Sequence, residues 1–174
     1  MQFIDKLGVN FMYAGLIHLA LPKAKIIHAL RSPMDNCYAA FKTLFPGVYR
    51  YSFDLKELAN YYVGHAKMIE HWKSVMPGVI HTARYEDLVS NSRPAIEDLL
   101  DYCDLSFDEN SLQTFLKAGE TGKISGVRLH QEIRAQSVGH WKNYHEQMQP
   151  VAEIFDAAGI EWRPDHDSNM GPPD

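Results

Sequence analysis

The sequence has little cysteine, no long apolar run and no glycine-rich phosphate loop. Its two cysteines, Cys37 and Cys103, lie too far apart for a disulfide framework or a zinc motif, which weakly favours a reducing, cytoplasmic location. No apolar stretch approaches the length of a transmembrane helix, and the N-terminus lacks a signal-peptide pattern, so we expect no membrane span. The missing Gly-Lys-Ser/Thr loop argues against a nucleotide kinase.

Basic residues are also few, because 17 lysines and arginines face 22 aspartates and glutamates, for a net charge of -5. This balance argues against a nucleic-acid-binding protein, but it allows a local basic pocket for a small anion. With 174 residues, 45% of them hydrophobic, the chain is long enough for one globular domain. We expect that domain over residues 1–163 and a disordered tail over 164–174.

The stretch 25–41 predicts a strand, a sharp turn and a helix. The apolar run Lys25–Leu30 is typical of a buried central strand in a parallel sheet. Arg31 stands where this strand would end, and the Ser-Pro-Met-Asp that follows is typical of a helix start. Ligands of open α/β sheets bind at the carboxyl ends of strands, where an arginine can hold a phosphate with two hydrogen bonds. The alternatives are pairing of Arg31 with Asp35, or simple solvation.

The remaining periodicity predicts a second strand and several helices, in an order that indicates an α/β fold with a parallel sheet. Two strands are too few for a stable sheet of this class, so we expect an upstream segment or a second chain to complete it. The expected elements are helices over Asn10–Leu21, Asp54–Val75, Ser92–Tyr102 and Pro150–Ala158, and a strand over Val79–Arg84, with Asn10 and Asp54 as caps.

A polar segment over Ala118–Gly139 interrupts this pattern. It holds four glycines together with Lys123, Arg128 and Arg134. A basic, glycine-containing loop of this length inside a compact domain is usually functional or mobile. A shorter helix is expected before it, over Phe107–Lys117.

Four short motifs occur in a fixed order. Residues 5–10 read Asp-Lys-Leu-Gly-Val-Asn, residues 31–35 read Arg-Ser-Pro-Met-Asp, and residues 84–88 read Arg-Tyr-Glu-Asp-Leu. Residues 125–141 combine a serine, a basic stretch and a final Ser-x-Gly-x-Trp. Together they resemble the carboxyl-terminal two-thirds of a sulfotransferase domain that uses 3′-phosphoadenosine 5′-phosphosulfate. The bacterial sulfotransferases attached to tetratricopeptide repeats and the tyrosylprotein sulfotransferases are the most similar groups.

The resemblance implies a P-loop-NTPase-like, three-layer α/β sulfotransferase fold that lacks its first strand and its 5′-phosphosulfate loop. It implies roles near the transferred sulfuryl group for Lys6 and Ser125. It also implies that four basic residues contact the nucleotide, namely Arg31, Arg128, Arg134 and Lys142. No metal is implied, and residues 84–88 are interpreted as structural, with Glu86 or Asp87 orienting Arg84 or the backbone.

Several positions depart from the family pattern. Ala39 stands where the family has a phosphate-binding serine, Gly8 replaces a proline, and the loop carries Arg128, His130 and Glu132 in place of glutamine, arginine and proline. Without the resemblance, a surface lysine beside Asp5 is the favoured interpretation of Lys6. The aromatic residues Tyr49, Tyr51 and Tyr62 are candidates for the border of an acceptor site, but packing is the favoured interpretation.

The expected function of the complete protein is transfer of a sulfuryl group to an unidentified hydroxyl or amine. The family's phosphosulfate loop and its usual base have no counterpart in these residues, so a fragment, a split gene or a degenerate homologue is expected. If the chain were active alone, His18 and His28 would be the first candidates for the base. The alternative is a non-catalytic module, which binds a nucleotide 3′-phosphate weakly or acts through protein contacts.

Overall fold

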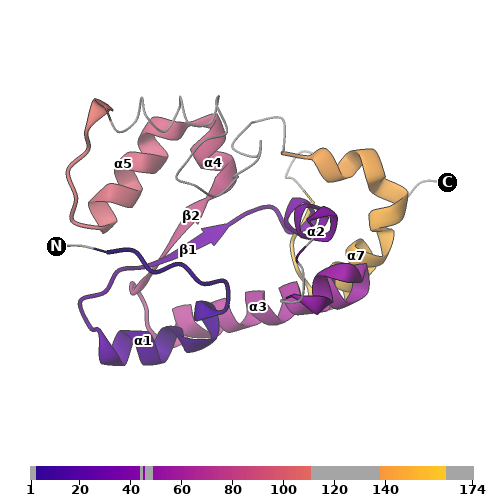
Figure 1. The fold of residues 1–174 in the computed structure, drawn as a ribbon, viewed down its shortest axis with the longest axis horizontal. Coiled ribbons are helices and arrows are strands. Elements are labelled where there is room, and N and C mark those ends of the chain that lie inside the picture. Colours follow the sequence, from indigo (N-terminus) through magenta and orange to yellow (C-terminus); the bar gives the residue numbers. More distant parts are fainter. Residues whose placement is uncertain (1–2, 44, 46–48, 111–137, 164–174) are drawn as a thin grey trace. The chain divides into compact units, whose positions relative to one another are not determined.

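The computed structural model describes residues 3–43, 45, 49–110 and 138–163, and its elements are labelled in Figure 1. The chain divides into two compact units. Unit 1 comprises Met1–Arg31 and His65–Val138, and unit 2 comprises Ser32–Gly64 and Gly139–Asp174. Within the described ranges, no helix combines the length and the apolar character needed to cross a bilayer.

Unit 1 contains a small parallel sheet with helices, which agrees with the expected α/β class. Strand β1 pairs with β2 in a register that runs from Ile26 opposite Ile80 to Leu30 opposite Arg84. The elements of this unit are η1 (Asn10–Tyr13), α1 (Ala14–Ala20), β1 (Ile26–Leu30), the second half of α3 (Leu55–Val75), β2 (Ile80–Arg84), α4 (Tyr85–Ser90) and α5 (Ser92–Tyr102).

The hydroxyl group of Tyr102, the last residue of α5, joins the beginnings of both strands. It donates to the carbonyl of Val79 at 2.6 Å and accepts the N–H of Ile26 at 3.2 Å. A half-buried backbone group without a hydrogen-bond partner destabilises the protein. One side chain satisfies such groups at the first residue of β1 and at the residue before β2. The packing of α5 on β2 therefore also fixes where the two strands begin.

The expectation that β1 is a fully buried strand is wrong for the described structure. Exposure alternates along β1, with Ile26, His28 and Leu30 half-buried, whereas Ile27 is 44% exposed. Successive side chains of a strand point to opposite faces, so the described elements cover only one face of β1. The ring of His65 on α3 lies against His28 on the covered face.

The helix expected over Asn10–Leu21 begins as the 3-10 helix η1 and continues as α1 to Ala20. The proposed cap is wrong, because Asn10 is already the first residue of η1, which follows Val9 and has no side-chain capping hydrogen bond. The Asn10 side-chain N–H instead donates to the Asp5 carboxylate at 3.1 Å. Several contacts hold this segment to α3, among them the rings of Phe11 and His65, whose centres are 4.7 Å apart. The Trp72 indole N–H donates to the carbonyl of Phe11 at 2.8 Å, and its ring lies directly against Gly15.

Unit 2 is a helical cluster around an apolar core. It contains α2 (Pro33–Lys42), η2 (Arg50–Phe53), the first half of α3, η4 (His140–Tyr144) and α7 (His145–Ala158). Tyr62 is 7% exposed and its ring lies 5.3 Å from that of Phe155, so it packs in the core as expected. The other fully buried apolar side chains near 0–3% exposure are Met34, Cys37, Leu58, Ala59, Met148 and Val151.

The ends of the helices in unit 2 test the capping predictions. The Asp54 carboxylate accepts the N–H groups of Lys56 and Glu57 at 2.8 and 2.9 Å, which confirms it as the cap of α3. Gly159 ends α7 with a φ of 69°. The start of α7 was predicted too late: the helix contains Pro150 in its interior, and the carbonyl that loses its partner belongs to the exposed Glu146.

The two glycines at 15 and 64 lie in helices but have different surroundings. A Cβ added at Gly15 would lie 2.7 Å from the ring of Trp72, whereas one added at Gly64 would meet nothing within 4 Å. We expect Gly15→Ala to lower the free energy of unfolding by about 1–3 kcal/mol through overpacking. We expect Gly64→Ala to raise it by about 0.5–1 kcal/mol, because alanine favours the helix. Denaturant unfolding of both variants measures this, and changes of the same sign would contradict the packing.

Candidate functional site

Arg31 lies between the end of β1 at Leu30 and the start of α2 at Pro33. Its guanidinium is stacked over the ring of Tyr85, with Cζ 4.9 Å from the ring centre. Tyr85 directly follows β2, so both residues of this pair come after the carboxyl end of a strand. An aromatic face attracts a guanidinium and leaves the N–H groups in the guanidinium plane able to donate hydrogen bonds. The Nε of Arg31 is itself buried, so the donors available to a ligand are those of the terminal nitrogens. The sheet edge therefore presents a positioned cation.

A second arginine lies at the same edge. Arg84 is the last residue of β2 and pairs in register with Leu30. Its Nε is 4.0 Å from the Asp87 carboxylate, and its side chain is 55% exposed, so this is a weak surface ion pair. The contact agrees with the expectation that residues 84–88 orient Arg84. Two arginines at the carboxyl edge of a parallel sheet make an arrangement suited to a phosphate.

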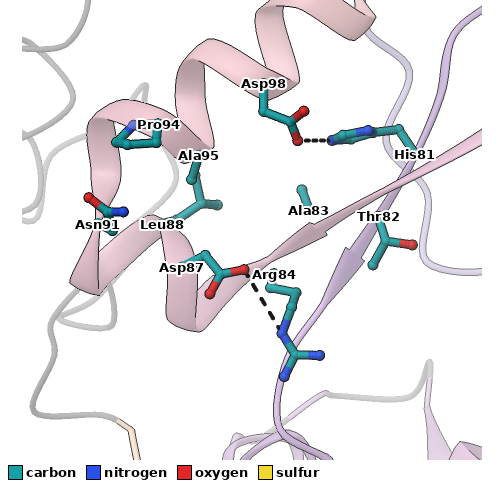
Figure 2. A pocket seen from close by; sticks show the side chains of 10 residues that line it. All are labelled: His81, Thr82, Ala83, Arg84, Asp87, Leu88, Asn91, Pro94, Ala95 and Asp98. Carbon is teal, nitrogen blue, oxygen red and sulfur yellow. Dashed lines mark ion pairs between the residues drawn. The ribbon is translucent and has the colours of Figure 1, made fainter.

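Behind this edge, a hollow of about 280 Å³ lies between β2, α4 and α5. Figure 2 shows its lining, with an ion pair between His81 and Asp98 at 3.4 Å and the pair Arg84–Asp87 nearer the edge. The ring of His81 also stacks on Tyr102 at 4.8 Å. Among its lining residues, the two basic side chains are matched by two carboxylates. A phosphate is therefore better accommodated at the edge beside Arg31 than inside this hollow.

In unit 2, a buried carboxylate links two of the sequence motifs. Asp35 is 1% exposed; its Oδ2 accepts the N–H of Gly139 at 2.6 Å, and its Oδ1 accepts that of Trp141 at 3.3 Å. The motif at residues 31–35 and the final Ser-x-Gly-x-Trp motif are therefore joined by direct hydrogen bonds. From the sequence alone, Asp35 is interpreted as a first-turn carboxylate or as a partner of Arg31, and these hydrogen bonds are not predicted. Its partners lie 104 and 106 positions away, beyond the reach of any local pattern.

The aromatic side chains beside these bonds connect α2 with η4. Tyr38 stacks on Tyr144 with ring centres 5.0 Å apart, and it meets the edge of His140 at 5.5 Å. Lys42 lies over the Tyr38 ring at 5.2 Å. Lys142 is exposed on η4, in the same unit. The surface formed by α2 and η4 thus combines aromatic rings with Lys42.

The structure locates three of the residues for which a role was predicted. Arg31 is at the sheet edge of unit 1, Lys6 is exposed in the segment before η1, and Lys142 is on η4 of unit 2. Ser125, Arg128 and Arg134 lie outside the described residues, as do the tail 164–174, most of the segment 118–139 and the later part of the helix expected over 107–117. The roles of all six residues stay predictions.

Burial shifts the pKa values of His28 on β1, His65 on α3 and Cys37 on α2. Burial, with the nearby His65 and Lys73, lowers the pKa of His28 to about 4, and both its ring nitrogens are buried without a hydrogen bond. His65, 5.1 Å away, also has a lowered pKa because it is buried. Burial raises the pKa of the Cys37 thiol to about 12. His28 is therefore a weak base at neutral pH, and Cys37 is a poor nucleophile.

Comparison with known proteins identifies the family. The model of the sulfotransferase family matches residues 1–109, more than half of the chain, so the chain belongs to this family. An uncharacterized protein of Aquifex aeolicus (strain VF5) is 30% identical over 157 residues, which cover 88% of this chain and 21% of that protein. The chain thus spans about a fifth of the length of the curated relative it matches.

Both cysteines are free thiols, as expected from their spacing. In the described ranges, no group of three or more histidine, cysteine, aspartate or glutamate side chains is arranged to hold a metal ion.

The lowered pKa of His28 predicts acid sensitivity of unit 1. A histidine with a normal pKa near 6.5 in the unfolded chain and about 4 in the folded chain binds protons preferentially when unfolded. Stability is therefore retained above about pH 6.5 and falls as the pH drops from there toward 4. After discounting for partial solvent access, His28 accounts for a loss of about 1–2 kcal/mol.

His28→Leu, which keeps a side chain of similar size, should remove this part of the pH dependence. His71→Gln is the matched control, because His71 is exposed on α3 and should leave the dependence unchanged. Denaturant unfolding at about pH 7 and about pH 5 measures both. An equal loss on acidification in His28→Leu and the unmodified chain would contradict the prediction.

Proposed function

We propose that this chain is the part of a 3′-phosphoadenosine 5′-phosphosulfate-dependent sulfotransferase that binds the 3′-phosphate of the nucleotide. The complete protein would transfer the sulfuryl group to a hydroxyl or amine. The observation that supports this most directly is the position of Arg31, stacked on Tyr85 at the carboxyl edge of the parallel sheet. Membership of the sulfotransferase family supports the reaction class.

Arg31 suits a phosphate for physical reasons that do not depend on the family. The Tyr85 ring limits the orientations of the guanidinium, so less conformational freedom is lost when an anion binds. A planar guanidinium can also donate two parallel hydrogen bonds to two phosphate oxygens, which an ammonium group cannot. Arg84 at the adjacent strand end adds positive potential at the same edge.

The transfer itself would be an in-line displacement at sulfur. The acceptor oxygen or nitrogen forms a bond to sulfur, the bond from sulfur to the 5′-phosphate oxygen breaks, and the acceptor proton passes to a base. Adenosine 3′,5′-bisphosphate leaves with the extra negative charge. A fixed cation near that phosphate lowers the barrier, and Lys6 is our candidate by resemblance, with Ser125 beside the sulfuryl group. Arg128, Arg134 and Lys142 are the further candidates for phosphate contacts.

We also propose that further strands complete the sheet into the P-loop-like, three-layer fold of the family. Two paired strands are fewer than a stable sheet usually has. An additional segment of a longer protein, or a second chain, could supply the missing strands. The matched relative, of which this chain covers 21%, is long enough to contain such a segment.

The competing proposal is a non-catalytic sulfotransferase-like module. Ala39 favours it, since that position of α2 carries no hydroxyl group for a phosphate. The low pKa of His28 favours it too, because this histidine is poorly suited to activate an acceptor. Such a module would bind the 3′-phosphate weakly or act through protein contacts. Recognition of the 3′-phosphate is tested first, because it is expected of the enzyme and of the weakly binding module.

Adenosine 3′,5′-bisphosphate should bind more tightly than adenosine 5′-monophosphate, because only the former offers a 3′-phosphate. A charge-assisted contact contributes roughly 1.5–3 kcal/mol, which corresponds to a preference of roughly 10- to 150-fold. We expect millimolar to high-micromolar affinity for the bisphosphate. Arg31→Ala should abolish the preference with the fold retained, and Arg31→Lys should restore part of it. Titrations followed by amide chemical shifts measure these affinities.

Arg93→Ala is the matched control for the arginine variants. Arg93 also belongs to unit 1 and lies over an aromatic ring, that of Phe107, but it is paired with Glu97 and Glu109. It should leave the preference unchanged. Equal binding of the two nucleotides by the unmodified chain, or an undiminished preference in Arg31→Ala, would remove the support for the phosphate assignment.

A further inference from the structure

We infer that Asp35 is a positioning residue for nucleotide binding: its carboxylate holds η4 in place and thereby orients Lys142. This inference rests on the proposed function, since it assigns Lys142 a contact with the bound nucleotide. All the residues concerned belong to unit 2. The chain of contacts runs from Asp35 to the backbone of Gly139 and Trp141, and from there to the lysine.

The first step is that both oxygens of the Asp35 carboxylate accept hydrogen bonds from the backbone at the start of η4. Asp35 is 1% exposed, and each of its oxygens accepts a backbone N–H, from Gly139 at 2.6 Å and from Trp141 at 3.3 Å. Burying a carboxylate carries a large desolvation cost, which hydrogen bonds to the charged group offset in part. A well-packed apolar residue would avoid that cost. The carboxylate instead fixes the orientation of the backbone, because its two acceptor oxygens determine where the N–H groups of Gly139 and Trp141 must lie.

The second step is that Gly139 is in contact with Lys142. Gly139 has a φ of 75°, and its carbonyl accepts the N–H of Lys142 at 3.1 Å, which closes the first turn of η4. A Cβ added at Gly139 would lie 3.9 Å from Cδ and from Cε of Lys142. The apolar stem of the lysine therefore lies over the glycine whose N–H the carboxylate holds.

The third step is that Trp141 fixes the other side of the turn. Its side chain is 8% exposed and meets the edge of Trp162 with ring centres 5.6 Å apart. Lys142, the next residue, is exposed. Successive residues thus point inward and outward, so the inward tryptophan and its hydrogen bond to Asp35 set the direction in which the lysine leaves the backbone.

The test is a double-mutant cycle between Asp35→Asn and Lys142→Ala, read as the dissociation constant for adenosine 3′,5′-bisphosphate. Asparagine has the same shape but only one acceptor oxygen, so its NH2 group must face one of the two backbone N–H groups. Each single variant should weaken binding by about 3- to 10-fold, the range for a solvent-exposed charge contact. The double variant should bind no more than about twofold more weakly than Lys142→Ala, because Asp35 acts through Lys142.

Asp54→Asn is the matched control. Asp54 also accepts two backbone N–H groups in unit 2, but at the exposed cap of α3, where asparagine is an equally good cap. It should leave nucleotide binding unchanged. The amide resonances of Gly139 and Trp141 should move in Asp35→Asn and stay in Asp54→Asn, which reports the loss of the hydrogen bonds directly.

The outcomes separate this inference from the proposed function. If the effects of Asp35→Asn and Lys142→Ala multiply, or if Lys142→Ala leaves binding unchanged, the positioning role is overturned while the Arg31 assignment stands. If the unmodified chain shows no preference for the 3′-phosphate, the proposed function fails and the inference fails with it. Should Asp35→Asn not fold, Gly139→Ala replaces it in the cycle, since a Cβ at a φ of 75° strains the same turn beneath Lys142.

Discussion

The parallel pairing of β1 with β2 determines what this chain can present to a ligand. Its register sets Leu30 opposite Arg84, so the residues that follow both strands emerge at one edge. Arg31 and Tyr85 meet there although they are distant in sequence, and the aromatic ring holds the guanidinium. A shift of this register would separate the cation from its support. The hydroxyl group of Tyr102, which binds backbone groups at the beginnings of both strands, favours the observed register.

In unit 2 a buried carboxylate fixes the position of η4, whereas in unit 1 strand pairing fixes the positions of the residues at the sheet edge. The carboxylate of Asp35 is enclosed with apolar neighbours of α2 such as Met34 and Cys37, which are 1% and 0% exposed. In such surroundings an unsatisfied carboxylate would be strongly destabilising, so its two N–H donors must stay in place. The constraint acts in both directions: η4 satisfies the charge, and the charge restricts η4. This rigidity is useful for a binding surface, and a purely apolar contact would slide more easily.

Local chemistry made most elements predictable, and long-range contacts account for what was missed. The apolar runs located β1 and β2, and Asp54 was identified as a cap because its partners are two and three residues away. Asn10 was misassigned because the first turn already includes it, with Val9 at the cap position. The links from Asp35 to η4 and from Arg31 to Tyr85 could not be predicted, since they depend on which distant segments come together. The candidate Arg31 followed from a motif, but the ring that positions it did not.

The chain has a net charge of -5, yet the candidate ligand is an anion. Long-range repulsion between the negatively charged chain and an anion does not prevent binding, because at physiological salt charges are largely screened beyond about 8 Å. Binding instead depends on direct contacts, for which the relevant quantity is the local arrangement of the Arg31 guanidinium over Tyr85 and of Arg84 beside Asp87. Such a site gains specificity from geometry more than from total charge. A phosphate that offers two oxygens to a fixed guanidinium is favoured there over a monovalent anion of the same size, whereas a strongly basic surface would bind both.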